Sequence, residues 1–275
     1  MYQKVEDHEN KLMQDSNIRD LYIPALKESL GIHSSEVDPA TVELYQSQIQ
    51  LRKNHLAIMN DKNGWLVLYN ILVPEVFCKD LVRIGTVGDG GKWVCNPIRM
   101  KHFETCTVYS MGIRNEPSFE EMFAKFTDKN CFIRSFDKDH QKSDTLKRIE
   151  NANGVFMKAF ISPTTDKISD HYNLRSLMEI YNDKKIDILK IDVEGFEFQI
   201  IDELTTIPMC QILIEVHAST AVRTLEFLRK LSQAGYYLFS YEINGAYHTL
   251  SEYSFIHESC FKDYGVTTVF GKYLS

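Results

Sequence analysis

Apolar residues from about position 104 onward follow two patterns that alternate along the chain. Short runs rich in β-branched and aromatic residues predict buried strands at residues 105–111, 131–136, 155–161, 186–191 and 212–216. Between and after them, apolar residues recur every three or four positions, which predicts helices at residues 119–126, 174–181, 196–204 and 222–231, and a polar helix is expected at residues 143–151. Strands that alternate with helices predict a mostly parallel sheet with helices on both faces.

The run from Ile186 to Ile191 predicts a strand buried in the middle of this sheet, and it stops abruptly on polar residues. Asp192, Glu194 and Gly195 follow it directly, where a parallel strand turns into the next helix. Ligands of open α/β sheets bind at the carboxyl ends of such strands. We therefore expect Asp192 to face a ligand.

The alternation stops after Gly235, where the last of these helices ends. Three extended stretches follow at residues 236–243, 253–257 and 266–270, with no helical pattern between them. Consecutive strands without crossover helices pair antiparallel, so we expect the sheet to finish with an antiparallel edge.

Residues 1–75 carry no strand pattern comparable to the later ones, and we interpret them as an N-terminal helical extension of a main domain at residues 76–275. Residues 1–36 are weakly patterned and predict a short helix or two. Asp38 and the proline after it form a helix start, and apolar residues then keep a helical spacing to Met59.

A glycine-rich turn separates two short strand patterns at residues 81–85 and 92–95. Three glycines and an aspartate in this turn supply the positive φ angles that a hairpin demands. The alternative is a lid whose glycines let the backbone approach a ligand closely.

Charge and composition exclude several classes of protein. The formal net charge of −7, without any Lys/Arg-rich run, offers no basic surface for a nucleic-acid backbone, so we expect no nucleic-acid partner. No apolar run approaches the ~20 residues of a membrane span, and the polar start is not a signal peptide. We therefore expect a soluble chain.

Six cysteines occur without any C-x-x-C pair, which disfavours zinc and thioredoxin-like sites. Cys106, Cys131 and Cys210 lie in or beside predicted strands, where we expect buried free thiols. Cys78 and Cys95 flank the predicted hairpin. A disulfide between them would place the chain in the secretory pathway, such as the Golgi lumen, behind a leader outside this sequence; free thiols would indicate the cytoplasm.

The turn after the first strand of the repeating pattern is where a doubly wound sheet usually holds its cofactor. Gly112 suits a tight turn there, but the G-x-G-x-x-G pattern is missing. Glu116 and Glu120 also place negative charge where a pyrophosphate would need a bare helix N-terminus. A dinucleotide is therefore disfavoured.

Asp137 ends the second strand, 25 residues after Gly112. That spacing is close to the ~20 residues expected for a carboxylate that binds a ribose diol, although an aspartate at a strand end also serves as a turn or helix cap. An adenosine ligand without a phosphate at the first helix satisfies both observations. S-adenosylmethionine is such a ligand.

The ordered segments YSMG, CFIRSFD, FMKAFIS, ILKIDVEGFE and ILIEVH resemble the FkbM-type S-adenosylmethionine-dependent methyltransferases. The segment RIG followed by DGGKWVC resembles the animal methyltransferase-like branch of that family. The resemblance covers roughly residues 75 to 260. It implies a Rossmann-like class I methyltransferase fold with a mostly parallel seven-stranded sheet.

The resemblance also implies which residues bind the cofactor, namely Ser110, Gly112, Asn115, Asp137, Phe160 and Asp192. Gly112 would be the glycine of the cofactor turn and Asp137 the ribose acid, while Phe160 would border the adenine. Asp192 and Glu194 would lie at the reaction end. The first turn departs from the common family pattern D-x-G-A-n-x-G, which leaves the binding of the methionine moiety open.

Glu215 and His217 point the same way on a predicted strand, and both would emerge near Asp192 if their strands are neighbours. His217 can serve as a general base toward a substrate hydroxyl, since imidazole titrates near neutral pH. It can also cap the following helix, or join Asp192 and Glu215 in holding a divalent metal. These three roles stay open, and no metal site is assigned from the sequence.

We therefore predict an enzyme that transfers a methyl group from S-adenosylmethionine, with Asp192, Glu194 and His217 as catalytic residues. The resemblance suggests O-methylation, and a sugar hydroxyl of a glycan is the favoured acceptor. A small metabolite or a protein is the alternative acceptor. A protein that binds the cofactor without turnover is the alternative from a different class, motivated by the incomplete first turn.

Overall fold

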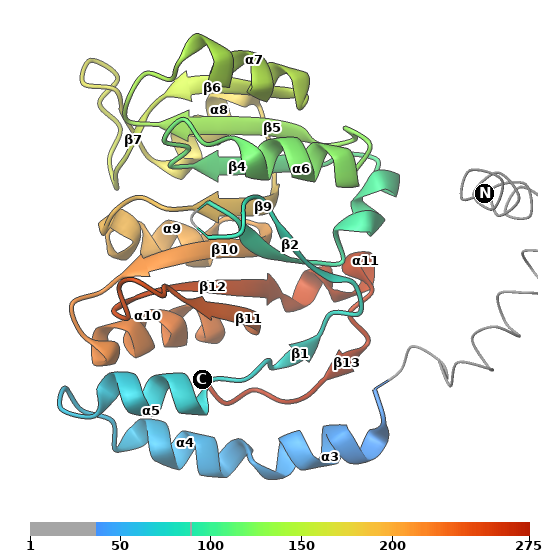
Figure 1. Cartoon of the computed structure of the whole chain (residues 1–275), viewed down its shortest axis with the longest axis vertical. Helices are drawn as coiled ribbons and strands as arrows, with labels where there is room; N and C mark the ends of the chain where they lie inside the picture. The colour runs from blue at the N-terminus through green and yellow to red at the C-terminus, as the bar shows by residue number, and fades with distance from the viewer. Residues whose placement is uncertain (1–36, 89) are drawn as a thin grey trace, which may run out of the picture. The chain divides into compact units, whose positions relative to one another are not determined.

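A seven-stranded sheet forms the centre of the computed structural model, which describes residues 37–88 and 90–275. In spatial order the strands are β11 (Tyr236–Ile243), β12 (Leu250–His257), β10 (Met209–His217), β9 (Ile186–Ile191), β4 (Thr107–Met111), β5 (Phe132–Asp137) and β6 (Gly154–Lys158) (Figure 1). The five strands from β10 to β6 pair in parallel, and β12 pairs antiparallel with both β10 and β11. The predicted Rossmann-like class I methyltransferase fold with an antiparallel edge is confirmed.

Strand order reverses between β4 and β9, because β5 and β6 continue to one side of β4 while β9 and β10 continue to the other. Met111 pairs with Ile191, so Gly112 and Asp192 follow these strands side by side. Gly112 has φ of +80°, and a Cβ atom there would lie 1.9 Å from the backbone oxygen of Asp192. Only glycine permits this approach, which brings the two loops together at the crevice where such sheets bind ligands.

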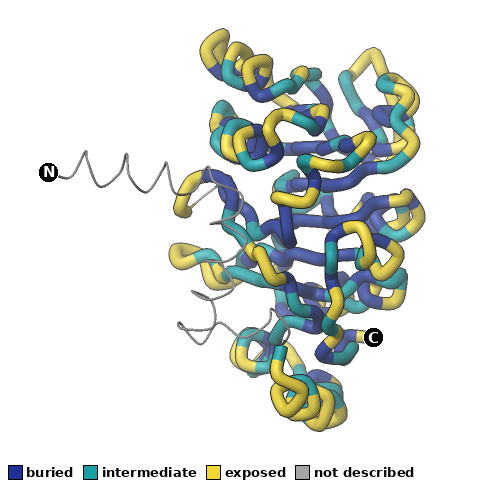
Figure 2. Tube along the Cα trace, turned by 90° about the vertical axis from the view of Figure 1, so that its right-hand side faces the viewer, coloured by how far each residue is buried: buried dark blue, intermediate teal, exposed yellow. Residues whose placement is uncertain are grey.

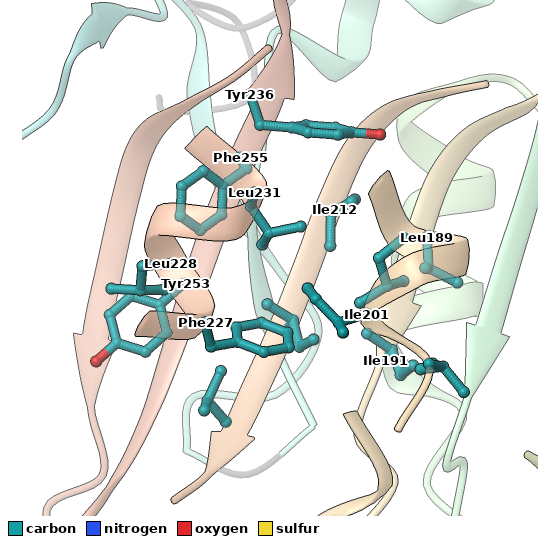
Figure 3. Close-up of a cluster of buried hydrophobic side chains, with 14 of the residues drawn as sticks. Leu189, Ile191, Ile201, Ile212, Phe227, Leu228, Leu231, Tyr236, Tyr253 and Phe255 are labelled. Carbon is teal, nitrogen blue, oxygen red and sulfur yellow. The ribbon is translucent and has the colours of Figure 1, made fainter. Parts of the chain in front are cut away.

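One face of the sheet is covered by α8 (Leu174–Tyr181), α9 (Ile201–Thr206) and α10 (Ala221–Gln233), and α5 (Gly64–Ile71) packs beside α10. Their apolar sides pack on residues such as Leu189, Ile212 and Phe255 of the strands (Figure 3). Leu228 and Leu231 of α10 are fully buried in this cluster. The central strands β12, β10, β9, β4 and β5 are buried along most of their length, and many exposed segments lie on the outer helices and loops (Figure 2).

The other face carries α6 (Ser118–Phe126), α7 (Ser143–Asn151), η1 (Pro97–His102), the short α11 (Phe261–Tyr264) and the antiparallel hairpin of β2 (Leu81–Ile84) and β3 (Lys92–Cys95). The predicted hairpin is therefore confirmed. A second apolar cluster lies beneath the hairpin, η1 and α6, and includes Ile84, Phe119 and Leu213.

The last extended stretch does not join the sheet, in contrast to the expectation for residues 266–270. Its strand β13 (Thr268–Val269) pairs with β1 (Val76–Phe77) in a separate ribbon. The reason is that Glu75 already occupies β11: its N–H donates to Leu238 O at 2.7 Å and its carboxylate accepts from Leu238 N at 3.0 Å. The last stretch meets this edge through Glu75 instead, because Phe270 N donates to Glu75 O at 2.8 Å.

Three helical segments precede the sheet and differ in detail from the prediction. The expected helix start is confirmed, since α3 (Pro39–Ser47) begins at the proline, but the helix is interrupted at Gln48 before α4 (Ile49–Ala57). Gly64 begins α5, a helix that we did not expect. Residues 39–275 form one compact unit, and the prediction for residues 1–36 lies outside the described residues.

Two further elements flank the site described below. The expected strand at residues 155–161 is divided into β6 and the short β7 (Phe160–Ile161), which pairs with β8 (His171–Tyr172). The segment after β9 forms a single turn, η2 (Phe196–Phe198), before α9 begins.

All six cysteines form disulfides, so the expectation of free thiols at Cys106, Cys131 and Cys210 is wrong. The pairs are Cys78–Cys95, Cys106–Cys131 and Cys210–Cys260. Cys106 and Cys131 come just before the neighbouring strands β4 and β5, and Cys210 lies on β10 beside the end of β12. The pairing thus follows from strand order, which cysteine spacing alone does not reveal.

No helix among the described residues is long and apolar enough to cross a membrane.

Candidate active site

Three of the predicted site residues meet at the carboxyl ends of β9 and β10. The imidazole Nε2 of His217 lies 3.7 Å from Asp192 Oδ1 and 3.6 Å from Glu194 Oε2. Asp192 directly follows β9, and His217 is the last residue of β10, which pairs with β9 in parallel. The expectation that these strands are neighbours is confirmed, and it explains why the two side chains meet.

Glu197, in the turn that follows β9, orients His217. Its Oε1 lies 2.9 Å from His217 Nδ1 and also accepts from the N–H groups of Val193 and Gly195. Glu194 and Gly195 both have positive φ, +54° and +101°, which turns the chain so that Glu197 reaches back to the strand end. The Glu197 side chain is fully buried, and it directs Nε2 toward Asp192 and Glu194.

Two buried carboxylate oxygens at this site have no hydrogen-bond partner among the described residues: Asp192 Oδ1 and Glu197 Oε2. Buried polar atoms in folded proteins are nearly always paired with protein groups, water or an ion. The Asp192 oxygen is the same atom that faces His217 Nε2. The site is thus incomplete in its polar contacts.

The concentration of acids shifts the pKa values of two side chains. Burial lowers the pKa of His217, but the hydrogen bond and charge of Glu197, with the charges of Asp192 and Glu215, outweigh it and raise that pKa to about 9. Burial and the neighbouring Asp192 raise the pKa of Glu215 to about 7. The site therefore carries a strongly negative local potential that favours a bound positive charge.

A row of acids continues from Glu215 across the antiparallel strands, because Glu215 pairs in register with Glu252 and Glu252 with Glu242. The hairpin supplies their partners: Lys92 Nζ lies 2.8 Å from Glu252 Oε1, and Arg83 Nε lies 2.8 Å from Glu242 Oε2. These ion pairs fix the hairpin, and with it the glycine-rich turn, over this face of the sheet.

The turn after β4 is held by side chains that bond within the protein. Asp137 Oδ2 accepts from Arg114 N at 2.7 Å, and its Oδ1 accepts from Asp139 N at 2.8 Å. Asn115 Oδ1 accepts from Lys142 N at 2.7 Å. The hydroxyl of Ser110 is buried and donates to Glu120. Ser110 therefore lies beneath the turn, away from the cluster around His217.

Phe160 begins β7, beyond the end of β6. Its ring stacks on His171, with centroids 4.6 Å apart, and meets Phe196 edge to face at 4.6 Å. Phe160 and Phe196 are both partly exposed. An aromatic surface of this kind can stack on a flat ring such as adenine.

The structure excludes one of the three roles considered for His217. It does not cap the next helix, because Thr220 caps α10 by accepting from Arg223 N at 3.2 Å. Sequence reasoning missed Glu197 and Lys92 as site residues. The contact of Glu197 depends on the positive φ angles of Glu194 and Gly195, and that of Lys92 on the packing of the hairpin over the sheet, so local sequence patterns did not mark either residue.

Comparison with known proteins shows which family the sequence matches. The model of a methyltransferase domain family matches residues 24–257. A comparison with curated protein sequences found no match.

Among solved structures, the pre-rRNA processing protein fibrillarin of Methanococcus jannaschii is 14% identical, with a TM-score of 0.38 over 68% of this chain and 86% of that one. A putative ribosomal RNA methyltransferase of Plasmodium falciparum is 13% identical, with a TM-score of 0.38 over 62% and 90% of the two chains. Fibrillarin of Aeropyrum pernix, solved with natively bound S-adenosyl-L-methionine, is 11% identical, with a TM-score of 0.33 over 67% and 86%.

Proposed function

The chain belongs to a family of methyltransferase domains, and on that premise we propose that it transfers the methyl group of S-adenosylmethionine to a sugar hydroxyl of a glycan. A methyltransferase domain on this Rossmann-like sheet takes its methyl group from S-adenosylmethionine, which is the cofactor expected from the sequence. The observation that carries the proposal is the cluster of Asp192, Glu194 and His217 beside the crevice between β4 and β9.

The residues around the first turn fit the adenosine end of the cofactor. Each Asp137 oxygen accepts one backbone N–H and keeps a further lone pair, so the carboxylate can also accept from a ribose hydroxyl. Phe160 offers a partly exposed ring to the adenine. Ser110 and Asn115 act indirectly in this proposal, by holding the turn in shape. When bound, the cofactor supplies an activated methyl group on a positively charged sulfur.

The residues at the ends of β9 and β10 position the acceptor. The carboxylates of Asp192 and Glu194 can accept hydrogen bonds from neighbouring sugar hydroxyls, which fixes the direction of the reacting oxygen. Catalysis then consists largely of holding the acceptor oxygen in line with the methyl group. The proton of the reacting hydroxyl passes to a carboxylate oxygen of Asp192 or Glu194.

Two properties of the chain support a glycan acceptor. Three disulfides that use every cysteine are typical of an oxidising compartment such as the Golgi lumen, where glycans are built. The net charge of −7 and the acidic site disfavour a phosphate-rich acceptor. The resemblance of KIDVEGFE and IEVH to FkbM-type enzymes of the animal branch agrees with O-methylation.

The rival is a protein that binds the cofactor without turnover, which the departure of the first turn from the family pattern favours. Isothermal titration with S-adenosylmethionine, followed by an assay for S-adenosylhomocysteine over a panel of glycans, small hydroxylated metabolites and peptides, separates the two. We expect micromolar cofactor binding and product with a glycan. Cofactor binding without product from any acceptor supports the rival. Product with a peptide or a metabolite alone would show that the acceptor is of that class and not a glycan.

A further inference from the structure

The spacing of the side chains at the ends of β9 and β10 suits one shared ion. His217 Nε2 lies 3.7 Å from Asp192 Oδ1 and 3.6 Å from Glu194 Oε2, which is too long for a hydrogen bond. Two atoms that each bind one ion at ~2.1 Å lie about 3.4 Å apart at a tetrahedral angle. One ligand atom from each of the three residues falls within 4.8 Å of the others. They therefore fit around a single ion with only small movements.

A second observation is the orphaned oxygen of Asp192. Its Oδ1 is buried without a hydrogen-bond partner in the described part of the chain, and it faces the imidazole nitrogen. A buried carboxylate oxygen without a hydrogen-bond partner costs free energy, and His217 Nε2 at 3.7 Å is too far to supply that bond, so a direct contact would be favourable. A cation between Oδ1 and Nε2 would provide that contact.

Glu197 prepares His217 as a metal ligand. With its Oε1 2.9 Å from Nδ1, the ring is held with the other nitrogen toward the two carboxylates. Histidine ligands in metal sites commonly donate their second N–H to a carboxylate, which fixes the ring and makes it a better ligand. The complete burial of Glu197 explains why the ring is held in place before any ligand arrives.

The positive side chains of Arg114 and Lys92 do not neutralise the acids of the cluster around His217. Arg114 approaches Glu194 only to 3.9 Å, and both side chains are largely exposed, 82% and 60%. Lys92 is committed to Glu252 at 2.8 Å. Glu215, buried on β10 next to Asp192, adds a further acid to the same region. A doubly charged cation would balance this excess.

We propose that Asp192, Glu194 and His217 bind a divalent transition-metal ion of the Mn²⁺ and Zn²⁺ class beside the acceptor site. The nitrogen ligand favours these ions over Mg²⁺ and Ca²⁺, which prefer oxygen alone. The inference deepens the proposed function of the same cluster, because a bound ion would orient the acceptor hydroxyl and help it lose its proton. Ion binding itself does not require that the acceptor be known.

The test is a titration of chelator-stripped protein with Mn²⁺, followed by electron paramagnetic resonance, and with Zn²⁺ by calorimetry. We expect one ion per chain. Asp192→Asn and Glu194→Gln should each weaken the affinity at least tenfold, and Glu197→Gln roughly ten- to a hundredfold. Glu226→Gln, at an exposed position of α10, should leave it unchanged.

Circular dichroism checks that each variant folds, and the 60% exposure of Glu194 makes Glu194→Gln the safest variant in this respect. The inference is overturned if wild type binds neither ion, or if Asp192→Asn and Glu194→Gln bind them as tightly as wild type. Titration of the same stripped protein with S-adenosylmethionine separates the two proposals. Cofactor binding and turnover without any ion would refute the metal site and leave the proposed methyltransferase activity standing. Ion binding without cofactor binding would support the metal site and refute the proposed activity.

Discussion

The two ends of the sheet are built differently. At the end where the parallel strands begin, Cys106–Cys131 joins the residues just before β4 and β5, and Cys210–Cys260 joins the start of β10 to the segment after β12. The third disulfide belongs to this end as well, because Cys95 exchanges two hydrogen bonds of 2.9 Å with Gln211 near the start of β10. At the end where the strands finish, the described residues form no disulfide, and acids whose oxygens lack a hydrogen-bond partner there lie around His217.

The difference separates what holds the fold from what acts on a ligand. Asp187, buried at the start of β9, accepts from Thr107 N at 2.8 Å through Oδ2. Its Oδ1 has no partner with hydrogen-bond geometry among the described residues, but it lies 2.9 Å from Lys185 Nζ, so both oxygens have a close contact within the protein. Asp192, five positions further and past the same strand, leaves Oδ1 without a hydrogen-bond partner in the described region, 3.7 Å from His217 Nε2. We infer that stability is concentrated at the first end and binding at the second, and substitutions at each end test this.

The largest expected effect is on stability and comes from the disulfide end. Cys210→Ala with Cys260→Ala opens a loop of 50 residues, which should lower the free energy of unfolding by about 4 kcal/mol. The affinity for S-adenosylmethionine should stay the same in the folded variant. Denaturant unfolding and calorimetry measure the two quantities.

The hairpin disulfide is the matched control for this change. It closes only 17 residues, so Cys78→Ala with Cys95→Ala should cost about 3 kcal/mol, less than the first pair. Cofactor affinity that falls in step with stability in either variant would show that the two ends are not separate.

Asp137→Ala should have the next largest effect, because Asp137 both holds the first turn and faces the proposed ribose site. Loss of hydrogen bonds to a charged group costs about 1–3 kcal/mol, so the dissociation constant of S-adenosylmethionine should rise roughly ten- to a hundredfold. Asp139→Ala, at an exposed position two residues on, should leave it unchanged. If wild type and a folded Asp137→Ala variant bind S-adenosylmethionine with the same dissociation constant, Asp137 does not bind the ribose.

The smallest effect is expected at Phe160. Phe160→Leu removes a ring that stacks on His171 and that we place against the adenine. Aromatic contacts contribute about 0.5–1.5 kcal/mol, so cofactor binding should weaken roughly two- to tenfold. Phe103→Leu is the control at the other end of the sheet, where the ring packs on Tyr264 at 5.3 Å and should affect stability alone. Weaker cofactor binding in the control variant would contradict the account.

Periodicity was sufficient to predict much of the fold, because the strands from β4 to β10 and their helices are local patterns. The meeting of Asp192 with His217 was also predictable, since successive strands β9 and β10 are neighbours in the sheet. The helix at residues 143–151 has the predicted bounds, although its sequence is largely polar.

Contacts between distant segments were not predictable from local patterns. Lys92 and Glu252 are 160 positions apart, and the hairpin must fold over the sheet before they meet. The Cys210–Cys260 disulfide depends on β12 returning beside β10. The contact of Glu197 with His217 depends on positive φ angles at Glu194 and Gly195, and a non-glycine residue such as Glu194 adopts such an angle only in particular turns.

The most direct test of the account is the turnover of Asp192→Asn beside wild type, at saturating S-adenosylmethionine and with the best acceptor from the panel. The substitution keeps the shape of the side chain and removes its charge. The account predicts a folded variant of nearly unchanged stability whose rate of S-adenosylhomocysteine formation falls at least a hundredfold, about 2.7 kcal/mol of transition-state stabilisation. Turnover at the wild-type rate would contradict the placement of the reaction at the carboxyl ends of β9 and β10.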